Sequence, residues 1–563
     1  MTYTPLPIGI DDFQDMIVKG YYYVDKTWLI KELLDKKGKV NLFTRPRRFG
    51  KTLNMSMLKY FFEKPQDGKD YTDLFAGMKI MDAGKTYTRE QQQYPVITLT
   101  LKSAKQPDWD MAYASMAEDI ANEFDRHSYV LKDGGMLEED KEKFKAIRGR
   151  RAERIDYAKS LAFLSKCLSD YYQKKTIILI DEYDVPLENA YYAGFYDEMI
   201  AFIRSLFESA LKTNLYLEFA VITGCLRISR ESVFTGLNNL KMISIMNEEY
   251  SEHFGFEEQE VKDMLGFYHR ENHMDTMKSW YDGYLFGNTE VYNPWSVINF
   301  MERLCINENS FPTAAWSNTS SNSIVRDLIY RADPAVKAEI EALVNGGTIE
   351  KQIHEDITYD DIYQSENNLW NFLFFTGYLK ACDRRMEMDS IYITFALPNR
   401  EVRSIYVNTI MSWFRDEVKE ENLQVLYSSL VNGDVEIFER ELEHQLQKTI
   451  SYMDGEEAFY HGFLLGILRN MNWITKSNRE AGDGRYDILI RSPELSKTPV
   501  ILELKTAKKR AELEKRAEDA LAQIHAMGYD ADLYEEGYSD VLYCGLGFFR
   551  KQVRVKMERH ELN

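Results

Sequence analysis

The distribution of apolar residues divides the chain into three regions of different pattern. In residues 1–289, short apolar runs rich in β-branched residues alternate with longer segments of helical periodicity. This alternation is typical of parallel strands covered by helices. We therefore predict an α/β fold for this region, a parallel sheet with helices on both faces, whose strands are Val40 to Thr44, Val96 to Leu101, Thr176 to Ile180 and Leu215 to Thr223.

Residues 290–454 have a pattern that predicts a mainly helical lid or connector. Asn293-Pro294 is a helix-start signal, because asparagine caps a first turn and proline fits the first helical position. Amphipathic segments follow at Asn408 to Glu417 and Val435 to Leu446. Within the first region, the charged stretch Lys132 to Arg154 predicts an exposed helical insertion or a mobile loop.

Residues 455–563 predict a small α/β domain. Helical and strand-like patterns alternate here over about 110 residues, a length that suits one compact domain. The predicted elements are a helix over Glu457 to Met471, strands over Asp487 to Arg491 and Val500 to Leu504, a helix over Ala511 to Met527, and a strand over Asp540 to Leu546.

Composition indicates a multidomain globular protein. The chain has 563 residues, of which 44% are hydrophobic and 28% charged, enough for several cores and a polar surface. Its apolar runs are too short to span a bilayer, and the first residues have neither the basic start nor the apolar run of a secretion signal. We therefore expect a cytoplasmic protein without a membrane partner, and we expect its five scattered cysteines to be reduced thiols.

Charge is distributed unevenly along the chain. The formal net charge is -20, which would repel nucleic acid if it were spread over the whole surface. Residues 451–563 contain 17 basic and 19 acidic side chains, a net charge of only -2. A surface for nucleic acid is therefore expected at the C-terminus.

The segment Arg45 to Thr52 (RPRRFGKT) has the features of a phosphate-binding loop between a strand and a helix. Backbone N–H groups at such a turn can cradle phosphates, while Lys51 would reach the β- and γ-phosphates and Thr52 would bind Mg²⁺ after Gly50. The ordinary pattern begins with glycine, a position that Arg45 occupies here. The other loop residues that we assign to nucleotide binding are Arg45, Arg47, Arg48 and Phe49.

An acidic pair supplies the expected second half of a nucleotide site. Asp181 and Glu182 end the buried strand Thr176 to Ile180, where one carboxylate would orient Mg²⁺ and the other would activate water. A solvated strand end is the alternative, and the presence of Lys51 makes it the weaker one. ATP or GTP is the implied ligand, and we expect ATP with Mg²⁺.

The strand after this pair offers two further candidates. Thr223 could sense the γ-phosphate and Arg227 could offset its charge; a strand edge with a surface arginine is the equally weighted alternative. Arg227 or Arg230 could also act across a subunit boundary of a homo-oligomer, as an arginine finger does, or form a salt bridge within the chain.

These motifs resemble those of the bacterial AAA-ATPase-like family over roughly residues 5–300. The resemblance rests on LPIGIDDF, YYVDKT, RPRRFGKT, LIDEYD, ITGCLRISRESVFTGLNNL and WYDGYLFG with YNPWSV. It implies a nucleotide-binding P-loop domain in which an arginine-rich loop replaces the first glycine. Asp25 and Lys26 match a family signature, for which we favour a structural salt-bridge role.

The last region contains an Asp, then Glu-x-Lys arrangement that is typical of a nuclease. Asp487 precedes Glu503 by sixteen residues, and Lys505 lies on the same strand face as Glu503 because side chains alternate along a strand. The two carboxylates could hold Mg²⁺ or Mn²⁺ at a phosphodiester, and the lysine could activate water. Charged strand ends without a function are the alternative.

Several neighbours support the catalytic interpretation. Glu457 and His461 lie one helical turn apart and could complete the metal shell, while Gln523 and Tyr529 could contact the substrate backbone. A run of basic residues could bind phosphate or form a solvated helix face: Lys508, Lys509, Arg510, Lys515 and Arg516.

The block from EAFYHGFLLGIL to ALAQIHAMGY resembles the PD-(D/E)XK nuclease superfamily over about residues 455–555. The resemblance implies a catalytic core of Asp487, Glu503 and Lys505. It also places Arg479, within Asn478-Arg479-Glu480, beside the active site, where we expect a substrate contact. His525 stands where relatives often have a lysine after the Gln-Ile pair.

Together, the motifs predict an ATP-binding, ATP-hydrolysing protein that controls a metal-dependent nuclease, with nucleic acid as the partner and DNA favoured over RNA. The alternative is an ATP-dependent switch or scaffold whose nuclease-like domain serves as a protein interaction module. The acidic first 450 residues favour that alternative, since they suit protein partners better than DNA.

Overall fold

The computed structural model describes most of the chain in two compact units. The described residues are 4–66, 68–132, 135–226, 233–234, 236–318, 334–344, 346–353, 366–407, 423–449, 457–468, 471, 473–481, 484–492, 494, 497–530, 533–534 and 536–562. The first unit extends to residue 319 and includes residues 350–402; the second comprises residues 320–349 and 403–563. The predicted connector, residues 290–454, is thus divided between them.

The first unit is built on a five-stranded parallel sheet, which confirms the predicted α/β class. Its strand order is β2-β3-β4-β1-β5, so β4 separates the strand before the phosphate loop from the strand before the acidic pair. Because β1 and β3 are buried along their whole length, they read as continuous apolar runs. The strands are β1 Val40–Thr44, β2 Val96–Thr100, β3 Thr176–Asp181, β4 Leu217–Gly224 and β5 Leu240–Ile243.

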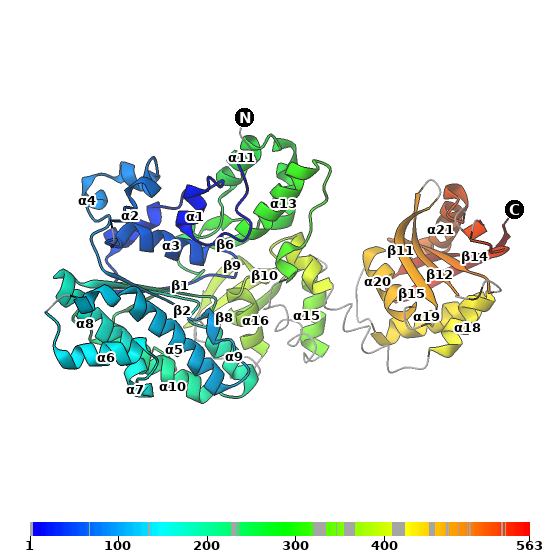
Figure 1. Cartoon of the computed structure of the whole chain (residues 1–563). Coiled ribbons are helices and arrows are strands. Elements are labelled where there is room, and N and C mark those ends of the chain that lie inside the picture. Colours follow the sequence, from blue (N-terminus) through cyan, green and yellow to red (C-terminus); the bar gives the residue numbers. More distant parts are fainter. Residues whose placement is uncertain are drawn as a thin grey trace. The chain divides into compact units, whose positions relative to one another are not determined.

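Helices cover both faces of this sheet, with α3 on one side and α5 and α8 on the other (Figure 1). Side chains cap two of them: Asp12 accepts the Asp15 N–H at the start of α1, and Asp108 accepts the Met111 N–H at the start of α5. The helices are α1 Phe13–Val18, α2 Trp28–Lys36, α3 Lys51–Phe62, α4 Lys85–Thr88, α5 Trp109–Arg126, α6 Glu138–Arg148, α7 Arg154–Ala158, α8 Ser160–Tyr172, α9 Val185–Ala193 and α10 Tyr196–Phe207.

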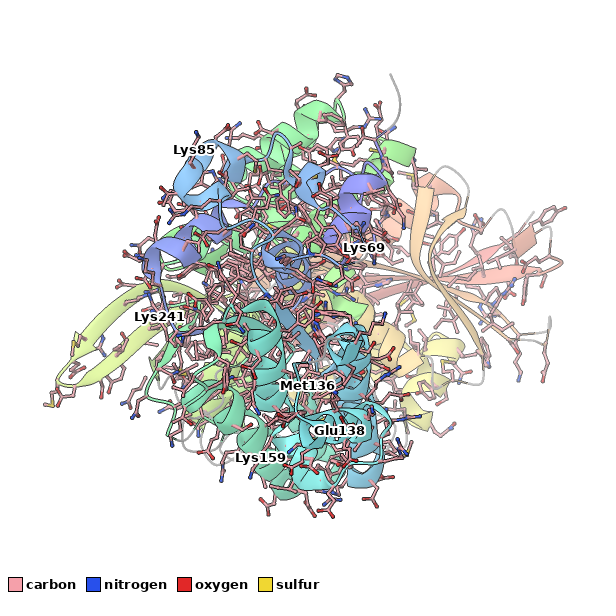
Figure 2. The ribbon with its side chains drawn as sticks, turned by 60° about the vertical axis from the view of Figure 1, so that its left-hand side comes forward. Lys69, Lys85, Met136, Glu138, Lys159 and Lys241 are labelled. Carbon is pink, nitrogen blue, oxygen red and sulfur yellow. The ribbon has the colours of Figure 1, made fainter. Side chains whose placement is uncertain are left out.

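The charged stretch Lys132 to Arg154 contains helix α6. Phe144 and Ile147 bury one side of α6, whereas its charged side chains remain near solvent. Glu138 at the start of α6 and Lys159 just before α8 are both exposed, and Figure 2 labels them in the lower part of the view. The central part of this stretch is therefore helical, which is the first of the two predicted alternatives.

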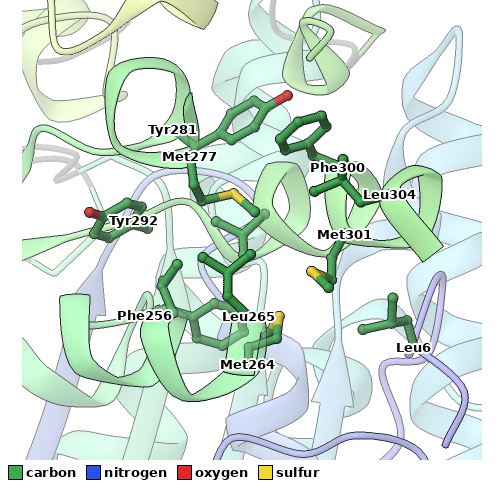
Figure 3. Packing of buried hydrophobic residues seen from close by; sticks show 12 residues of the cluster. Leu6, Phe256, Met264, Leu265, Met277, Tyr281, Tyr292, Phe300, Met301 and Leu304 are labelled. Carbon is green, nitrogen blue, oxygen red and sulfur yellow. The ribbon is translucent and has the colours of Figure 1, made fainter. Parts of the chain in front are cut away.

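An apolar cluster packs the helices that follow β5 against a residue near the N-terminus of the chain. Leu6 packs with residues from α11 Glu258–Phe267, α12 Met274–Tyr281 and α13 Pro294–Ile306 (Figure 3). Asn293 caps α13 by accepting the Ser296 N–H, as the Asn-Pro signal predicted. The short hairpin β6 Tyr284–Phe286 and β7 Thr289–Val291 lies between α12 and α13 in the chain.

The predicted connector contains strands as well as helices. β8 Ile349–Ile353, β9 Lys380–Glu387 and β10 Ser390–Ala396 form a sheet in the order β8-β10-β9, and α16 Glu366–Phe375 precedes β9. The strand β9 did not stand out in the sequence because most of it is exposed and polar. The predicted segment Asn408 to Glu417 lies outside the described residues.

The C-terminal part is a five-stranded mixed sheet with a helix packed on it, as predicted. The strand order is β11-β12-β13-β14-β15, and only the β13–β14 pair is parallel. The strands are β11 Ile474–Ala481, β12 Gly484–Arg491, β13 Val500–Thr506, β14 Asp540–Phe549 and β15 Gln552–Glu561. The helices of this unit are α15 Pro334–Val344, α18 Gln424–Asn432, α19 Val435–Thr449, α20 Glu457–Leu468 and α21 Leu513–Met527.

Within the described residues, every helix is too short or too polar to cross a membrane.

Candidate functional site

The phosphate loop connects β1 to α3 through backbone conformations that favour a tight turn. Arg48 and Gly50 both have left-handed φ angles, of 70° and 80°. Gly50 is the residue before α3, so the loop needs a residue without a Cβ penalty at that position. Lys51 and Thr52 therefore begin the helix, where N–H groups have no partner within the helix.

Lys51 is buried, and its own loop holds its ammonium group. Nζ donates to the carbonyl oxygens of Arg45 at 3.0 Å and Pro46 at 2.9 Å, and lies 3.4 Å from Sγ of Cys225. These acceptors compensate a desolvated charge. A phosphate entering the loop would offer stronger, charged acceptors for the same donors.

Asp181, at the end of β3, connects the phosphate loop to the end of β4. Its Oδ2 accepts a hydrogen bond of 2.7 Å from Thr52, and its Oδ1 accepts one from the Thr223 hydroxyl. The structure thus brings together three residues that the sequence assigned to nucleotide and metal binding. A hydroxyl and a carboxylate side by side are the ligands that hold Mg²⁺ in P-loop proteins.

Glu182 follows Asp181 in an unusual backbone conformation. Its φ angle of 54° lies in the left-handed region, which non-glycine residues rarely occupy and which concentrates at functional sites. Burial and the neighbouring Asp181 raise the pKa of this carboxyl, while Lys51 opposes the rise. A carboxyl group whose pKa is raised in this way is suited to accept a proton.

Aromatic residues from later in the sequence cover the loop. Phe49 is fully buried, with ring centroids 5.0 Å from Tyr284 and 5.1 Å from Phe286. A Cβ on Gly377 would lie 2.9 Å from Cβ of Pro46, so that glycine permits a close approach to the loop. The loop is therefore a packed element, and Phe49 is placed for packing.

Arg45 is fully buried beneath the loop. Its Nη1 donates to the carbonyl oxygens of Thr44 at 3.0 Å and Ile243 at 2.9 Å, and its guanidinium lies over the rings of Phe254 and Phe286. The side chain thus ties the loop to the end of β5 and to the aromatic cover. This geometry supports the loop from below, whereas the sequence suggested a residue at the nucleotide itself.

The other two loop arginines point to different neighbours. Arg47 forms an ion pair of 2.6 Å with Glu188 on α9, and the exposed Arg48 stacks 4.2 Å from the ring of Trp295. Arg227 and Arg230 lie outside the described residues.

Asp184 is a site residue that the sequence interpretation missed. It is buried, and its Oδ2 accepts the N–H groups of Cys225 at 2.8 Å and Leu226 at 2.9 Å, directly after β4. The Tyr183 hydroxyl donates to the Leu226 carbonyl oxygen at 2.7 Å. The loop after β3 thereby fixes the loop after β4; the third acid in Asp181-Glu182-Tyr183-Asp184 was the available signal.

Asp25 and Lys26 have structural partners. Asp25 accepts the backbone N–H groups of Thr27 at 2.8 Å and Lys79 at 2.7 Å. Lys26 is buried and forms an ion pair of 2.6 Å with Glu260 at the start of α11. The ion pair of Lys26 agrees with the salt-bridge role that we favoured, whereas Asp25 accepts backbone N–H groups.

Two neighbouring strands bring the second constellation together. Asp487 on β12 accepts the Leu504 N–H at 2.9 Å through Oδ2, and its own N–H donates to Glu503 Oε2 at 3.4 Å. Lys505 lies 3.3 Å from Glu503 Oε1. Burial, followed by the charge of Asp487, raises the pKa of Glu503 to about 7. Two carboxylates and a lysine thus share one small site.

Helix α21 adds Gln523 to this site. Its Nε2 donates to Glu503 Oε1 and, at 3.1 Å, to the hydroxyl of the buried Tyr529. Gln523 thus contacts the carboxylate and Tyr529 contacts Gln523; the substrate contact that we expected of both residues stays a prediction. Parallel pairing sets Gly545 and Gly547 beside Glu503 and Lys505, on the same sheet face.

These two glycines allow the helix to approach. A Cβ on Gly545 would lie 2.6 Å from the backbone N of Leu521, and one on Gly547 would lie 2.8 Å from that of Ala517. Helix α21 therefore packs backbone against backbone on β14, which brings Gln523 within reach of Glu503.

The additional metal ligands proposed from sequence have a different geometry. His461 Nε2 lies 2.9 Å from the backbone carbonyl oxygen of Asp487, so the ring contacts the main chain. The structure does not describe the side chains of Glu457 and Arg479. Within the described residues, no group of three or more His, Cys, Asp or Glu side chains could hold a metal ion.

A two-carboxylate site nevertheless fits Mg²⁺. This ion commonly binds through one or two carboxylates and keeps several waters or substrate phosphate oxygens. Burial first, and then the charge of Asp487, raises the pKa of Glu503, and a bound cation would offset both effects. Asp487 and Glu503 would therefore be its protein ligands.

Comparison with known proteins assigns both regions. Residues 7–234 match the family model described as a predicted AAA-ATPase, and residues 455–558 match that of the PD-(D/E)XK nuclease superfamily. The chain therefore has an AAA-ATPase-like domain and a C-terminal nuclease-superfamily domain, which confirms both resemblances.

One curated relative is similar over part of its length. It is a protein of Azotobacter chroococcum mcd 1, described as an uncharacterized protein in the vnfD 5′ region. The two are 27% identical over 307 residues, which cover 54% of this chain and 53% of the relative. This chain thus spans about half the length of that protein.

Proposed function

We propose that this protein binds and hydrolyses ATP in its first region and uses the nucleotide state to control a metal-dependent nuclease at its C-terminus. Nucleic acid is the substrate, with DNA favoured over RNA. The observation that carries the proposal is the buried Glu503 beside the partly buried Asp487, with Lys505 next to them.

The ATP site is supported by the convergence of three chain segments. Lys51 would exchange its two loop carbonyls for phosphate oxygens, and Thr52 with Asp181 would hold Mg²⁺. Glu182 would accept a proton from the attacking water. Thr223, which contacts Asp181, would report whether the γ-phosphate is present.

The nuclease chemistry divides among three side chains. A divalent ion supplies a Lewis acid and lowers the pKa of its bound water. Asp487 and Glu503 would hold that ion, and Gln523 fixes the orientation of Glu503. Lys505 would orient the attacking water and offset charge that develops on the phosphate.

Cleavage assays with paired variants test the whole proposal. The parent chain, Lys51→Ala and Asp487→Ala are compared on labelled DNA and RNA with Mg²⁺ or Mn²⁺, each with and without ATP. We expect the parent to cut, Asp487→Ala to be inactive in every condition, and Lys51→Ala to lose the response to ATP.

The outcomes separate the alternatives. A parent chain that binds ATP and cuts no nucleic acid would exclude the nuclease and leave the ATP-dependent switch or scaffold. Cleavage by Lys51→Ala that equals the parent's with and without ATP would show that the two sites are not coupled.

A further inference from the structure

The basic side chains of the C-terminal region differ in their ion pairing. Among the described residues from 457 onward, most of those on β12, β13 and β15 have carboxylate partners: Arg491, Lys505, Arg554, Lys556 and Arg559. By contrast, Lys508, Lys509 and Arg510 are exposed and form no ion pair within this part of the structure. We call these three residues the basic connection.

The basic connection directly follows the strand that carries Glu503 and Lys505. β13 ends at Thr506, and the Ala507 N–H donates to the Phe548 carbonyl oxygen at 2.8 Å, which keeps the chain on the sheet up to that point. The chain then turns through the short helix Arg510–Glu512 into α21.

The chain that follows the basic connection returns to the sheet close to Lys505. The first turns of α21 lie against Gly547, the residue paired with Lys505 on the neighbouring strand. The connection thus leaves the sheet one residue after Thr506 and returns beside Lys505. The backbone that carries the three cations is therefore held beside the site at both of its ends.

Nearby carboxylates are already engaged. Glu512 accepts the backbone N–H of Lys508 at 3.1 Å, and Glu514 pairs with Lys556 from β15. The three cations therefore create a local positive surface although the chain as a whole has a net charge of -20. Unpaired lysine and arginine side chains on an acidic protein are suited to a polyanion.

We propose that the basic connection binds the phosphodiester backbone of DNA and positions the strand for the Asp487, Glu503 and Lys505 site. This inference rests on the proposed nuclease function. Contacts of lysine and arginine to phosphates fix register and carry no sequence information. The connection would therefore raise affinity for every DNA sequence equally.

Binding at several salt concentrations tests the inference. The full chain carries Asp487→Ala so that the DNA stays intact, and fluorescence anisotropy follows a labelled mixed-sequence duplex, its single strand and the matching RNA. The test variant is Lys508→Gln, Lys509→Gln and Arg510→Gln combined. The matched control removes three paired cations from β15: Arg554→Gln, Lys556→Gln and Arg559→Gln.

We expect the test variant to bind DNA more weakly and to lower the slope of log K against log salt by about 2 to 3, since each lost phosphate contact removes about 0.9. The control should keep a slope close to that of the unmodified background. Thermal unfolding of all three proteins checks that each is folded.

Two results would overturn the inference. One is a test variant with the background's affinity and slope; the other is an equal loss in the control, which would make the effect one of net charge. If the background chain binds none of the three nucleic acids, the proposed function fails together with this inference.

Discussion

The ammonium group of Lys51 lies 2.9 Å from the carbonyl oxygen of Pro46, within the same loop. A nucleotide must therefore replace an existing acceptor, and the lysine is already desolvated and oriented when it arrives. Pre-orientation of this kind reduces the entropy that binding would otherwise cost.

Replacing Lys51 by alanine should weaken ATP binding by about two to three orders of magnitude, because loss of a buried, charge-assisted contact costs about 3 to 4 kcal/mol. Isothermal titration calorimetry with ATP and Mg²⁺ measures the change. Lys59→Ala, on the same helix but beside Tyr60, is the control and should leave ATP affinity at the parent's value.

Glu182→Gln should separate ATP binding from hydrolysis. The amide keeps the size of the side chain but cannot accept a proton, so we expect phosphate release to fall by about 10²-fold or more while ATP still binds. Glu118→Gln removes a surface partner of Arg150 and serves as the control. Unchanged hydrolysis in Glu182→Gln would remove Glu182 from the catalytic role.

Arg45→Ala should destabilise the first unit by roughly 3 kcal/mol, because the carbonyls of Thr44 and Ile243 lose the hydrogen bonds from Arg45 and a cavity opens between two rings. Urea unfolding followed by tryptophan fluorescence measures this loss. The exposed Arg48 provides the comparison: Arg48→Ala should cost less than about 1 kcal/mol. Equal costs would contradict the supporting role of Arg45.

Metal binding at Asp487 and Glu503 should strengthen as pH rises. The pKa of Glu503 is raised to about 7, so below that pH a metal ion must displace a proton. We expect Mn²⁺ affinity to increase by up to about tenfold per pH unit until about pH 7 and then to level off.

The same shift fixes the sign of the effect on stability. The folded state holds the Glu503 proton more tightly than the unfolded state, so without metal this contribution is present in acid and is lost as pH rises through about 7. Glu503→Gln should flatten that stability profile. A Mn²⁺ affinity that is flat across this range in the parent would argue against Glu503 as a ligand.

Gly545→Ala should impair cleavage through helix α21. The new Cβ would meet the backbone of Ala517 and Leu521, which cannot rotate away, so the helix must shift at a cost of about 1 to 3 kcal/mol. Gln523 would then lose Glu503, and we expect kcat to fall while the protein stays folded. In Gly528→Ala the new Cβ meets nothing within 4 Å, so this change should affect stability alone.

The sequence predicted the elements whose apolar pattern is continuous. β1 and β3 are buried throughout and stand out at once, whereas β5 was missed because it has four residues and includes Lys241. β15 was missed because it alternates valine with charged residues over only half of its length.

Residue types also predicted which side chains meet, but not every role. A threonine after Gly-Lys and an acid after a buried strand placed Thr52 and Asp181 in one site, and they lie 2.7 Å apart. No local pattern could show that Arg45 would lie over Phe254 and Phe286, since those rings are more than 200 positions away. Such roles depend on tertiary packing.

The cover over the phosphate loop has a consequence for biosynthesis. Pro46 and Phe49 lie against Gly377, Tyr284 and Phe286, residues that leave the ribosome long after the loop itself. Contacts between such distant positions form late, because the intervening chain must first be made and closed into place. A nascent chain that ends at residue 234 would have the strand, loop and acidic pair with Pro46 and Phe49 still uncovered, so we expect the loop to reach its packed form only after synthesis has passed residue 377.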